Sequence, residues 1–182
     1  AEYVTLLNND TRVEPDWLSY LIDTAERNPK IGLCEAQQVT WDGKGLIQLK
    51  LKPDWMEGQR FIEPIQSEVI APYPTSYAAG CCSLIRRETI EHIGVFDHRY
   101  FAYVEDVDLS FRAWLAGYDV YKAPASIVYH KGGVTMPSIR SMALGYRNQL
   151  FTLFKNLELS TLRRFSRSIL QRWVFTRNRY AL

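Results

Sequence analysis

Apolar runs of strand length alternate with helix-like patterns along most of this chain, which limits the folds open to it. The clearest helical stripe runs from Val107 to Tyr118, and Gly117 ends it. Alternating strands and helices favour an α/β sandwich built around a sheet. We expect strands at Tyr3–Leu7, Ile31–Val39, Ile47–Lys52, Tyr77–Ile85 and Val120–Tyr129, helices from Pro15 to Asn28 and at Arg87–Ile93, and a loop from Pro53 to Pro74.

Length and composition favour one globular domain, since 182 residues with 47% hydrophobic residues can bury a sizeable core. No apolar run approaches the roughly 18 residues of a membrane span, and we expect no secretion signal at the start. The cysteines Cys34, Cys81 and Cys82 are odd in number, which suits a reducing compartment. We assign them no role, because a zinc site would need further ligands at suitable spacing.

Charge divides the chain into two parts. Residues 1–130 hold 12 basic and 19 acidic residues, whereas residues 131–182 hold 10 and 1. We therefore expect a domain over residues 1–137 and a basic helical tail over residues 138–182. Two helices are expected in the tail, and the second, from about Ser160, combines arginines with an apolar stripe of Leu162, Phe165, Ile169 and Trp173.

A basic amphipathic helix of this kind suits an anionic membrane surface at the cytoplasmic face. Docking on the rest of the chain or on a partner protein explains residues 160–182 about as well. We expect no nucleic acid as a partner, because no recognised binding module accompanies the arginines.

Three carboxylates gather at the start of the central helix. Capping of the helix dipole explains Glu105 and Asp108, and Asp108 also forms an i,i+4 pair with Arg112. Asp106 lies off the apolar stripe, on a face with the small residues Ser110 and Ala113, which leaves room for a ligand. The helix N-terminus favours the ionised form of Asp106, as a general base requires.

Polar residues also follow the first and the last strand. Asp10 ends Asn8-Asn9-Asp10 at the expected carboxyl edge of the sheet, where ligands bind, although an Asx-rich turn explains it as well. His130 precedes Gly132, and a glycine lets the backbone approach a phosphate; a strand-end histidine bonded to backbone is the alternative. A divalent ion held by one aspartate, one histidine and a diphosphate would use both Asp10 and His130.

Taken in order, these residues resemble the inverting glycosyltransferases of family 2, which have the GT-A fold. The resemblance runs from the first strand to about Asn156. It is carried by Leu6-Leu7-Asn8-Asn9-Asp10-Thr11, Pro15, Trp17, Gly80, Arg86-Arg87, Gly94-Val95-Phe96-Asp97, Phe101, Glu105-Asp106-Val107-Asp108-Leu109, Arg112, Gly117-Tyr118 and His130.

The resemblance implies transfer of a sugar from a UDP-, GDP- or dTDP-sugar to a saccharide or lipid-linked acceptor, with inversion. It assigns Asp106, preceded by Glu105, as general base, and Asp10 with His130 as ligands of Mg²⁺ or Mn²⁺. It also implies a role in cell-surface glycan synthesis. Together with the basic tail, this predicts a cytoplasmic enzyme that is peripheral at the inner face of the membrane. The residues it places against the donor and its diphosphate are Asn8, Asn9, Asp10, Gly80 and Gly132.

Two departures from the family pattern change these expectations. Asn8 replaces the first acid of the metal motif, as in rhamnosyltransferase-like members, so fewer charges bind the metal. Members of the family also begin with a nucleotide-binding region of roughly 80–100 residues before this strand. We therefore expect a GT-A sandwich truncated at its N-terminus, with weakened donor binding. Gln171-Arg172-Trp173 lacks the spacing of the processive synthases' motif, which favours single-sugar transfer.

Two other classes of protein compete with this interpretation. A non-catalytic relative that kept the sheet and lost donor binding would act as a binding module. The second class is an adaptor that binds a membrane or a partner through its basic tail.

Overall fold

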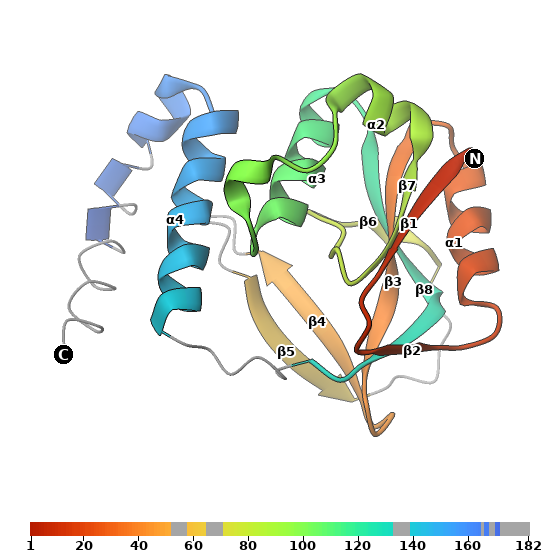
Figure 1. Cartoon of the computed structure of the whole chain (residues 1–182). Helices are drawn as coiled ribbons and strands as arrows, with labels where there is room; N and C mark the ends of the chain where they lie inside the picture. Colours follow the sequence, from red (N-terminus) through yellow and green to blue (C-terminus); the bar gives the residue numbers. More distant parts are fainter. Residues whose placement is uncertain (52–57, 65–70, 133–138, 165, 168–169, 172–182) are drawn as a thin grey trace.

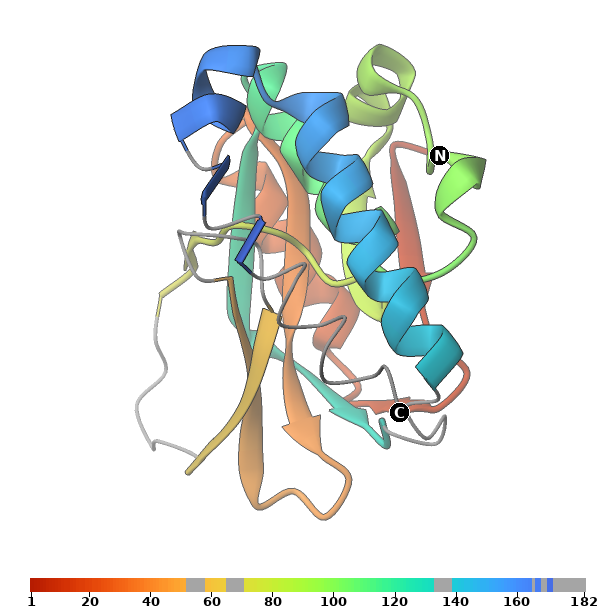
Figure 2. The same ribbon diagram turned by 90° about the vertical axis from the view of Figure 1, so that its left-hand side faces the viewer.

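The computed structural model describes residues 1–51, 58–64, 71–132, 139–164, 166–167 and 170–171. Its centre is a mixed eight-stranded sheet (Figure 1). One face is covered by α1 (Trp17–Glu26) and the other by α2 (Arg87–Ile93) and α3 (Glu105–Leu115). A fourth helix, α4 (Ile139–Asn156), packs on the outer side of α3 (Figure 2).

The sheet is built around β3 (Ile31–Thr40), in which every residue but the last is buried. On one side β3 pairs in parallel with β8 (Asp119–His130); on the other, its first half pairs antiparallel with β7 (Cys82–Arg86). Near its end β3 forms a hairpin with β4 (Gly45–Leu51). The remaining strands are β1 (Tyr3–Leu7) beside β7, β5 (Gly58–Pro64) beside β4, and β2 (Thr11–Val13) and β6 (Tyr73–Pro74) beside β8.

Alternation along β3 sends its side chains to opposite helical layers. Cys34 packs with Leu21 and Ala25 of α1, whereas Leu33 packs with Leu109 and Ala113 of α3. These six side chains are almost fully buried. The sheet is thus covered on both faces, which confirms the α/β sandwich and leaves its strand ends as the place for a site.

Most predicted elements are present, and the loop predicted for residues 53–74 is wrong in part. That segment contains β5, whose seven residues all pair with β4, and the short β6. Pro64 and Pro74, two of the prolines that indicate a loop, are the last residues of β5 and β6, and β5 is the last strand in the sheet order. An edge strand tolerates proline, which cannot donate to a ladder.

The strand predicted at Tyr77–Ile85 is wrong in its first half. Only Cys82–Arg86 pairs as β7, and Tyr77, Ala78 and Ala79 are buried without strand pairing. They are apolar because they pack against α3 and α4, where Tyr77 and Ala79 contact Val107 and Leu153.

The tail begins with α4, and helical residues recur at 159–164, 166–167 and 170–171, in line with the two predicted helices. The predicted domain boundary at residues 137 and 138, and Phe165, Ile169 and Trp173 of the predicted stripe, lie outside the described residues. No helix among the described residues has the length and hydropathy needed to span a membrane.

Candidate active site

Strand pairing brings Asp10 and His130 together from opposite ends of the domain. Antiparallel pairing of β2 with β8 sets Thr11 opposite His130, and the Lys131 amide donates to the Asp10 carbonyl at 3.0 Å. As a result Asp10 Oδ1 lies 3.3 Å from His130 Nε2, with both side chains partly exposed. β2 was not predicted, because three residues are too few to show a strand period.

A buried polar chain fixes the orientation of the His130 ring. Gln38 Nε2 donates to Glu35 Oε1 at 2.9 Å, so Gln38 Oε1 faces His130 Nδ1 at 3.2 Å and accepts its hydrogen. Glu35 in turn pairs with Lys122 at 3.2 Å, and both are about 95% buried. With hydrogen on Nδ1, the Nε2 lone pair of a neutral imidazole faces the Asp10 carboxylate.

This arrangement fits a divalent cation. Two electron-rich atoms that face each other need a proton or a cation nearby, and neighbouring ligands around octahedral Mg²⁺ lie about 3 Å apart. The Asp10–His130 distance of 3.3 Å is close to that value. Among the described residues no group of three or more His, Cys, Asp and Glu side chains is placed to hold a metal. A metal here would therefore have two protein ligands and take the rest from substrate or water.

The Gly80–Cys81 segment connects this pair to Asp106. The Gly80 amide donates to Asp106 Oδ2 at 3.0 Å, while the Cys81 carbonyl accepts from the Asn8 amide at 3.0 Å. The thiol of Cys81, to which no role was assigned, lies near His130. Hydrogen bonds from Cys82 and then His130 lower the pKa of Cys81 to about 7 against the effect of burial.

Burial dominates the ionisation of Asp106. Its pKa is raised to about 6, chiefly by burial and further by the nearby charge of Glu105, while hydrogen bonds from the Gly80 and Val107 amides oppose the rise. The expectation that the helix N-terminus governs this carboxylate is therefore wrong. A pKa near 6 still leaves Asp106 mostly ionised at neutral pH and well matched to accept a proton.

The small-residue face of α3 does not leave room for a ligand, contrary to expectation. Ser110 Oγ donates to the Asp106 carbonyl at 2.8 Å and accepts from the Ala78 amide at 3.1 Å. Ala113 is fully buried. The segment at 77–80 fills this face, because small residues let its backbone approach the helix. A ligand therefore cannot reach Asp106 along this face.

Glu105 and Asp108 lie in the first turn of α3, where their charges complement the helix dipole as expected, but neither makes a side-chain cap bond. Glu105 Oε2 is buried and has no hydrogen-bond partner among the described residues. Buried carboxylate oxygens normally have a donor, so a bound hydroxyl is a natural partner for this one.

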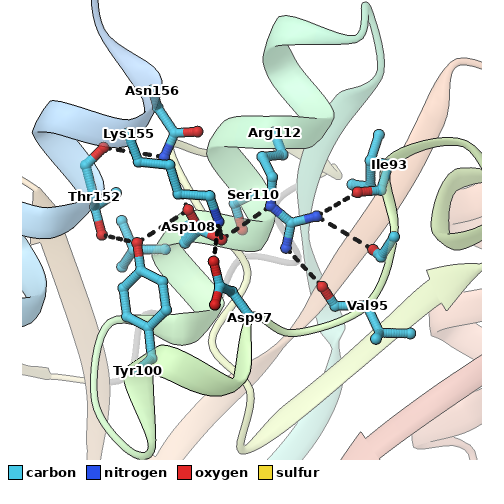
Figure 3. A network of polar contacts seen from close by, with 12 residues as sticks. Ile93, Val95, Asp97, Tyr100, Asp108, Ser110, Arg112, Thr152, Lys155 and Asn156 are labelled. Carbon is cyan, nitrogen blue, oxygen red and sulfur yellow. Dashed lines mark hydrogen bonds and ion pairs between the residues drawn. The ribbon is translucent and has the colours of Figure 1, made fainter.

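Asp108 is the centre of a polar network that joins α3 to α4 (Figure 3). The predicted pair with Arg112 is present at 2.9 Å, but Asp108 is fully buried and also accepts from Lys155 at 2.9 Å. The Tyr100 hydroxyl and the Asn156 amide also donate to the Asp108 carboxylate, at 3.0 and 2.9 Å. Local spacing revealed only Arg112, since the α4 partners lie about fifty positions away in the sequence.

The remaining predicted donor-binding residues lie at the same end of the sheet. Asn8 and Asn9 are exposed in the turn before Asp10. Gly132 follows β8 with φ of +50°, a conformation that favours glycine. Contacts thus link Asn8 and Asp106 to the Gly80–Cys81 segment, and Asp10 to His130, while Asn9, Glu105 and Gly132 adjoin these residues in the sequence or follow them closely.

Comparison with known proteins gives matches over most of the chain. A family model described as glycosyl transferase family group 2 matches residues 3–175. Two relatives, from Mycobacterium tuberculosis strains CDC 1551 / Oshkosh and ATCC 25618 / H37Rv, are named N-acetylglucosaminyl-diphospho-decaprenol L-rhamnosyltransferase. Each is 30% identical over 155 residues, which cover 74% of this chain and 48% of the relative. The chain thus spans about half the length of these relatives.

Solved structures with similar folds also match. GalNAc-T7 with UDP, GalNAc and Mn²⁺ has a TM-score of 0.60 at 16% identity, covering 84% of this chain and 31% of that one. The mannosyltransferase PcManGT from Pyrobaculum calidifontis, in complex with GDP-Man and Mn²⁺, has a TM-score of 0.52 at 13% identity. That match covers 86% of this chain and 40% of PcManGT.

Proposed function

The chain belongs to glycosyl transferase family group 2, and from this premise we propose that it transfers a sugar from a nucleotide-sugar to an acceptor hydroxyl with inversion. Its fold is the GT-A fold, as expected. The observation that carries the proposal is the placement of Asp106 and the Asp10–His130 pair on either side of the Gly80–Cys81 segment.

In this reaction Asp106 is the general base. One of its carboxylate oxygens accepts the proton of the acceptor hydroxyl, whose oxygen then forms a bond to the anomeric carbon. The bond from that carbon to the diphosphate breaks, and the diphosphate leaves with the electron pair on the opposite face, which inverts the configuration. Hydrogen bonds from Gly80 and Val107 hold the carboxylate in place. The buried Oε2 of Glu105 is available to a second hydroxyl of the acceptor.

Asp10 and His130 would hold Mg²⁺ or Mn²⁺, which neutralises charge on the leaving diphosphate when bound. Gln38 and Glu35 keep the His130 ring in the orientation that this requires. We propose that Asn8, Asn9 and the backbone at Gly132 contact the diphosphate: Asn8 and Asn9 are exposed just before Asp10, and Gly132 comes two positions after His130. Support comes from the solved neighbours, which contain Mn²⁺ with UDP or GDP-Man.

Removal of either proposed metal ligand is expected to weaken nucleotide binding. In isothermal titration with Mn²⁺ plus UDP, GDP or dTDP, we expect Asp10→Asn or His130→Ala to lower affinity at least about 10-fold. His92→Ala is the matched control, because His92 lies exposed on α2. A wild-type protein that gives no metal-dependent heat with any of the three nucleotides would instead support a non-catalytic binding module.

The acceptor we favour is lipid-linked, and its site is the inner face of the membrane. The name of the tuberculosis relatives includes a diphospho-decaprenol acceptor. In the tail, Arg163 and Arg167 are exposed, as is Leu170 at 63%. Leu162, in contrast, packs on the cluster around Leu153, so the start of this helix docks on the chain itself.

Deletion of the residues after Ser160 is expected to abolish binding to vesicles that contain anionic lipid. The physical reason is electrostatic, since each arginine near such a surface contributes about 1 kcal/mol. Co-sedimentation with phosphatidylglycerol vesicles measures this, and neutral phosphatidylcholine vesicles are the control. If the truncated protein sediments as the wild type does, the tail is not the membrane-binding element.

A further inference from the structure

The turn before the proposed base has an unusual backbone. Phe101, Tyr103 and Val104 have φ values of 63°, 67° and 71°, the left-handed region that side chains other than glycine rarely occupy. A β-branched residue such as Val104 is the least suited to it. Such conformations persist only where the surrounding structure imposes them, and they gather at functional sites. Here they directly precede Glu105 and Asp106.

One side chain from α4 holds this turn. Asn148 is fully buried, and its amide Nδ2 donates to the carbonyls of Tyr100, Ala102 and Tyr103 at 2.9, 2.7 and 2.8 Å. An amide group has two hydrogens, so the three carbonyls share them and must converge on one point. The neighbouring Arg147 donates to the Arg99 carbonyl on the same stretch. The α4 helix thus fixes the backbone path of the turn.

The Asp108 network anchors α4 against α3 independently of Asn148. Lys155 and Asn156 bond Asp108 from the last turn of α4, two turns beyond Asn148, and Thr152 bonds the Tyr100 hydroxyl at 2.7 Å (Figure 3). None of these contacts involves a carbonyl of the turn. Loss of Asn148 would therefore release the turn while α4 stays docked.

The turn sets where α3 begins. Val104 is the N-cap of α3, and its carbonyl accepts the first helical bond from the Asp108 amide at 3.0 Å. Asp106 lies within that first turn and reaches Gly80. A displaced Val104 would move Asp106 relative to the Asp10–His130 pair, which is held by separate strands.

We propose that Asn148 is a positioning residue that, by holding the 101–104 turn, places the Asp106 carboxylate for proton transfer. The proposal rests on the proposed function of Asp106. It makes α4 part of the catalytic apparatus, although no α4 side chain reaches the reacting atoms.

Asn148→Ala is expected to lower kcat by about 10–100-fold, the effect of roughly 1 Å of misplacement. KM for the nucleotide-sugar should stay within about twofold, since Asp10 and His130 keep their places. The acid limb of the kcat–pH profile should also move to lower pH, because Asp106 loses burial. Asn156→Ala is the matched control: the same change on the same helix, expected to lower Tm but to keep kcat.

Val104→Gly in the Asn148→Ala background provides the second variant. Glycine adopts positive φ without strain, so the turn would need less support, and kcat should recover at least about threefold over the single variant. The proposal is overturned if Asn148→Ala keeps wild-type kcat, if Asn156→Ala loses as much kcat, or if glycine at position 104 restores nothing. Full turnover by Asp106→Asn would instead overturn the proposed function itself.

Discussion

Replacement of Asp106 by asparagine is expected to lower kcat by about 10²–10⁴-fold, the contribution of a positioned general base. The change keeps the size of the side chain and an oxygen that can accept from Gly80, but it removes the group that accepts the proton. Affinity for the nucleotide should remain within about twofold, since Asp10 and His130 are untouched. Steady-state kinetics with a UDP-, GDP- or dTDP-sugar measures both quantities.

Asp23→Asn makes the same chemical change at an exposed position on α1 and serves as the control. Circular dichroism and thermal unfolding establish that both variants are folded. Wild-type turnover by Asp106→Asn would refute the assignment of the base.

The raised pKa of Asp106 also specifies the pH dependence of the wild-type enzyme. The base acts only when ionised, so activity is present above the pKa and is lost as pH falls through it. With the pKa raised to about 6, mainly by burial, we expect the acid limb of kcat near pH 6 and not near pH 4, where an exposed aspartate would place it. An acid limb near pH 4 would mean that Asp106 is more solvated than its contacts indicate.

Replacement of Asp108 by asparagine is expected to destabilise the protein by about 3 kcal/mol, the low end of the cost of breaking a buried ion pair. Asp108 is fully buried and bonded to both Arg112 and Lys155, and its charge compensates theirs. The cost lies at the low end because Lys155 keeps its contact with Asp97 at 2.8 Å. Tm should fall by roughly 10 °C in a chain of this size.

Glu91→Gln is the matched control, because the Arg87–Glu91 pair has the same i,i+4 spacing and the same distance of 2.9 Å as Asp108–Arg112. That pair is exposed at 57% and 65%, so we expect a cost below about 0.5 kcal/mol. Equal losses in the two variants, measured by urea unfolding at pH 7, would contradict the role assigned to burial.

The loss of stability at acid pH should also depend on the Asp108 network. Although burial raises the pKa of Asp108, hydrogen bonds from Asn156, Lys155 and Arg112 outweigh it and lower the pKa. A carboxylate with a lowered folded-state pKa contributes stability that is present above its unfolded pKa, near 4, and lost as pH falls through the folded value. The wild type should therefore lose more stability than Asp108→Asn between about pH 5 and pH 2.

Elements with a strong local period could be predicted, and short or edge elements could not. The stripe from Val107 to Tyr118 located α3 within two residues of its start, because burial of one helical face repeats every third or fourth position. β2 has three residues and β6 has two, too few to show a period of two. Prolines around β5 indicate a loop in the sequence, although the strand pairs along its whole length.

Residue type and order in the sequence predict which residues form the site. Their spacing in the sequence does not predict how these side chains lie relative to one another. Asp10, Asp106 and His130 are predicted from polar residues at the ends of strands and at the start of a helix, and from the family resemblance. The orientation of His130 depends on Gln38 and Glu35 of β3, which carry no local signal. The raised pKa of Asp106 depends on burial, which outweighs the hydrogen bonds from the Gly80 and Val107 amides and is set by tertiary packing.

By itself, the sequence determined the α/β class, the family and the identity of the acids and the histidine, because periodicity and residue type are local properties of the chain. Only the tertiary structure decided that Asp108 is the buried centre of a network that includes α4, and that Asn148 holds the turn before Asp106. The α4 partners in these contacts are more than forty positions away in the sequence. Contacts between residues so far apart produce no periodic pattern in the sequence, because they form only when α4 packs against α3.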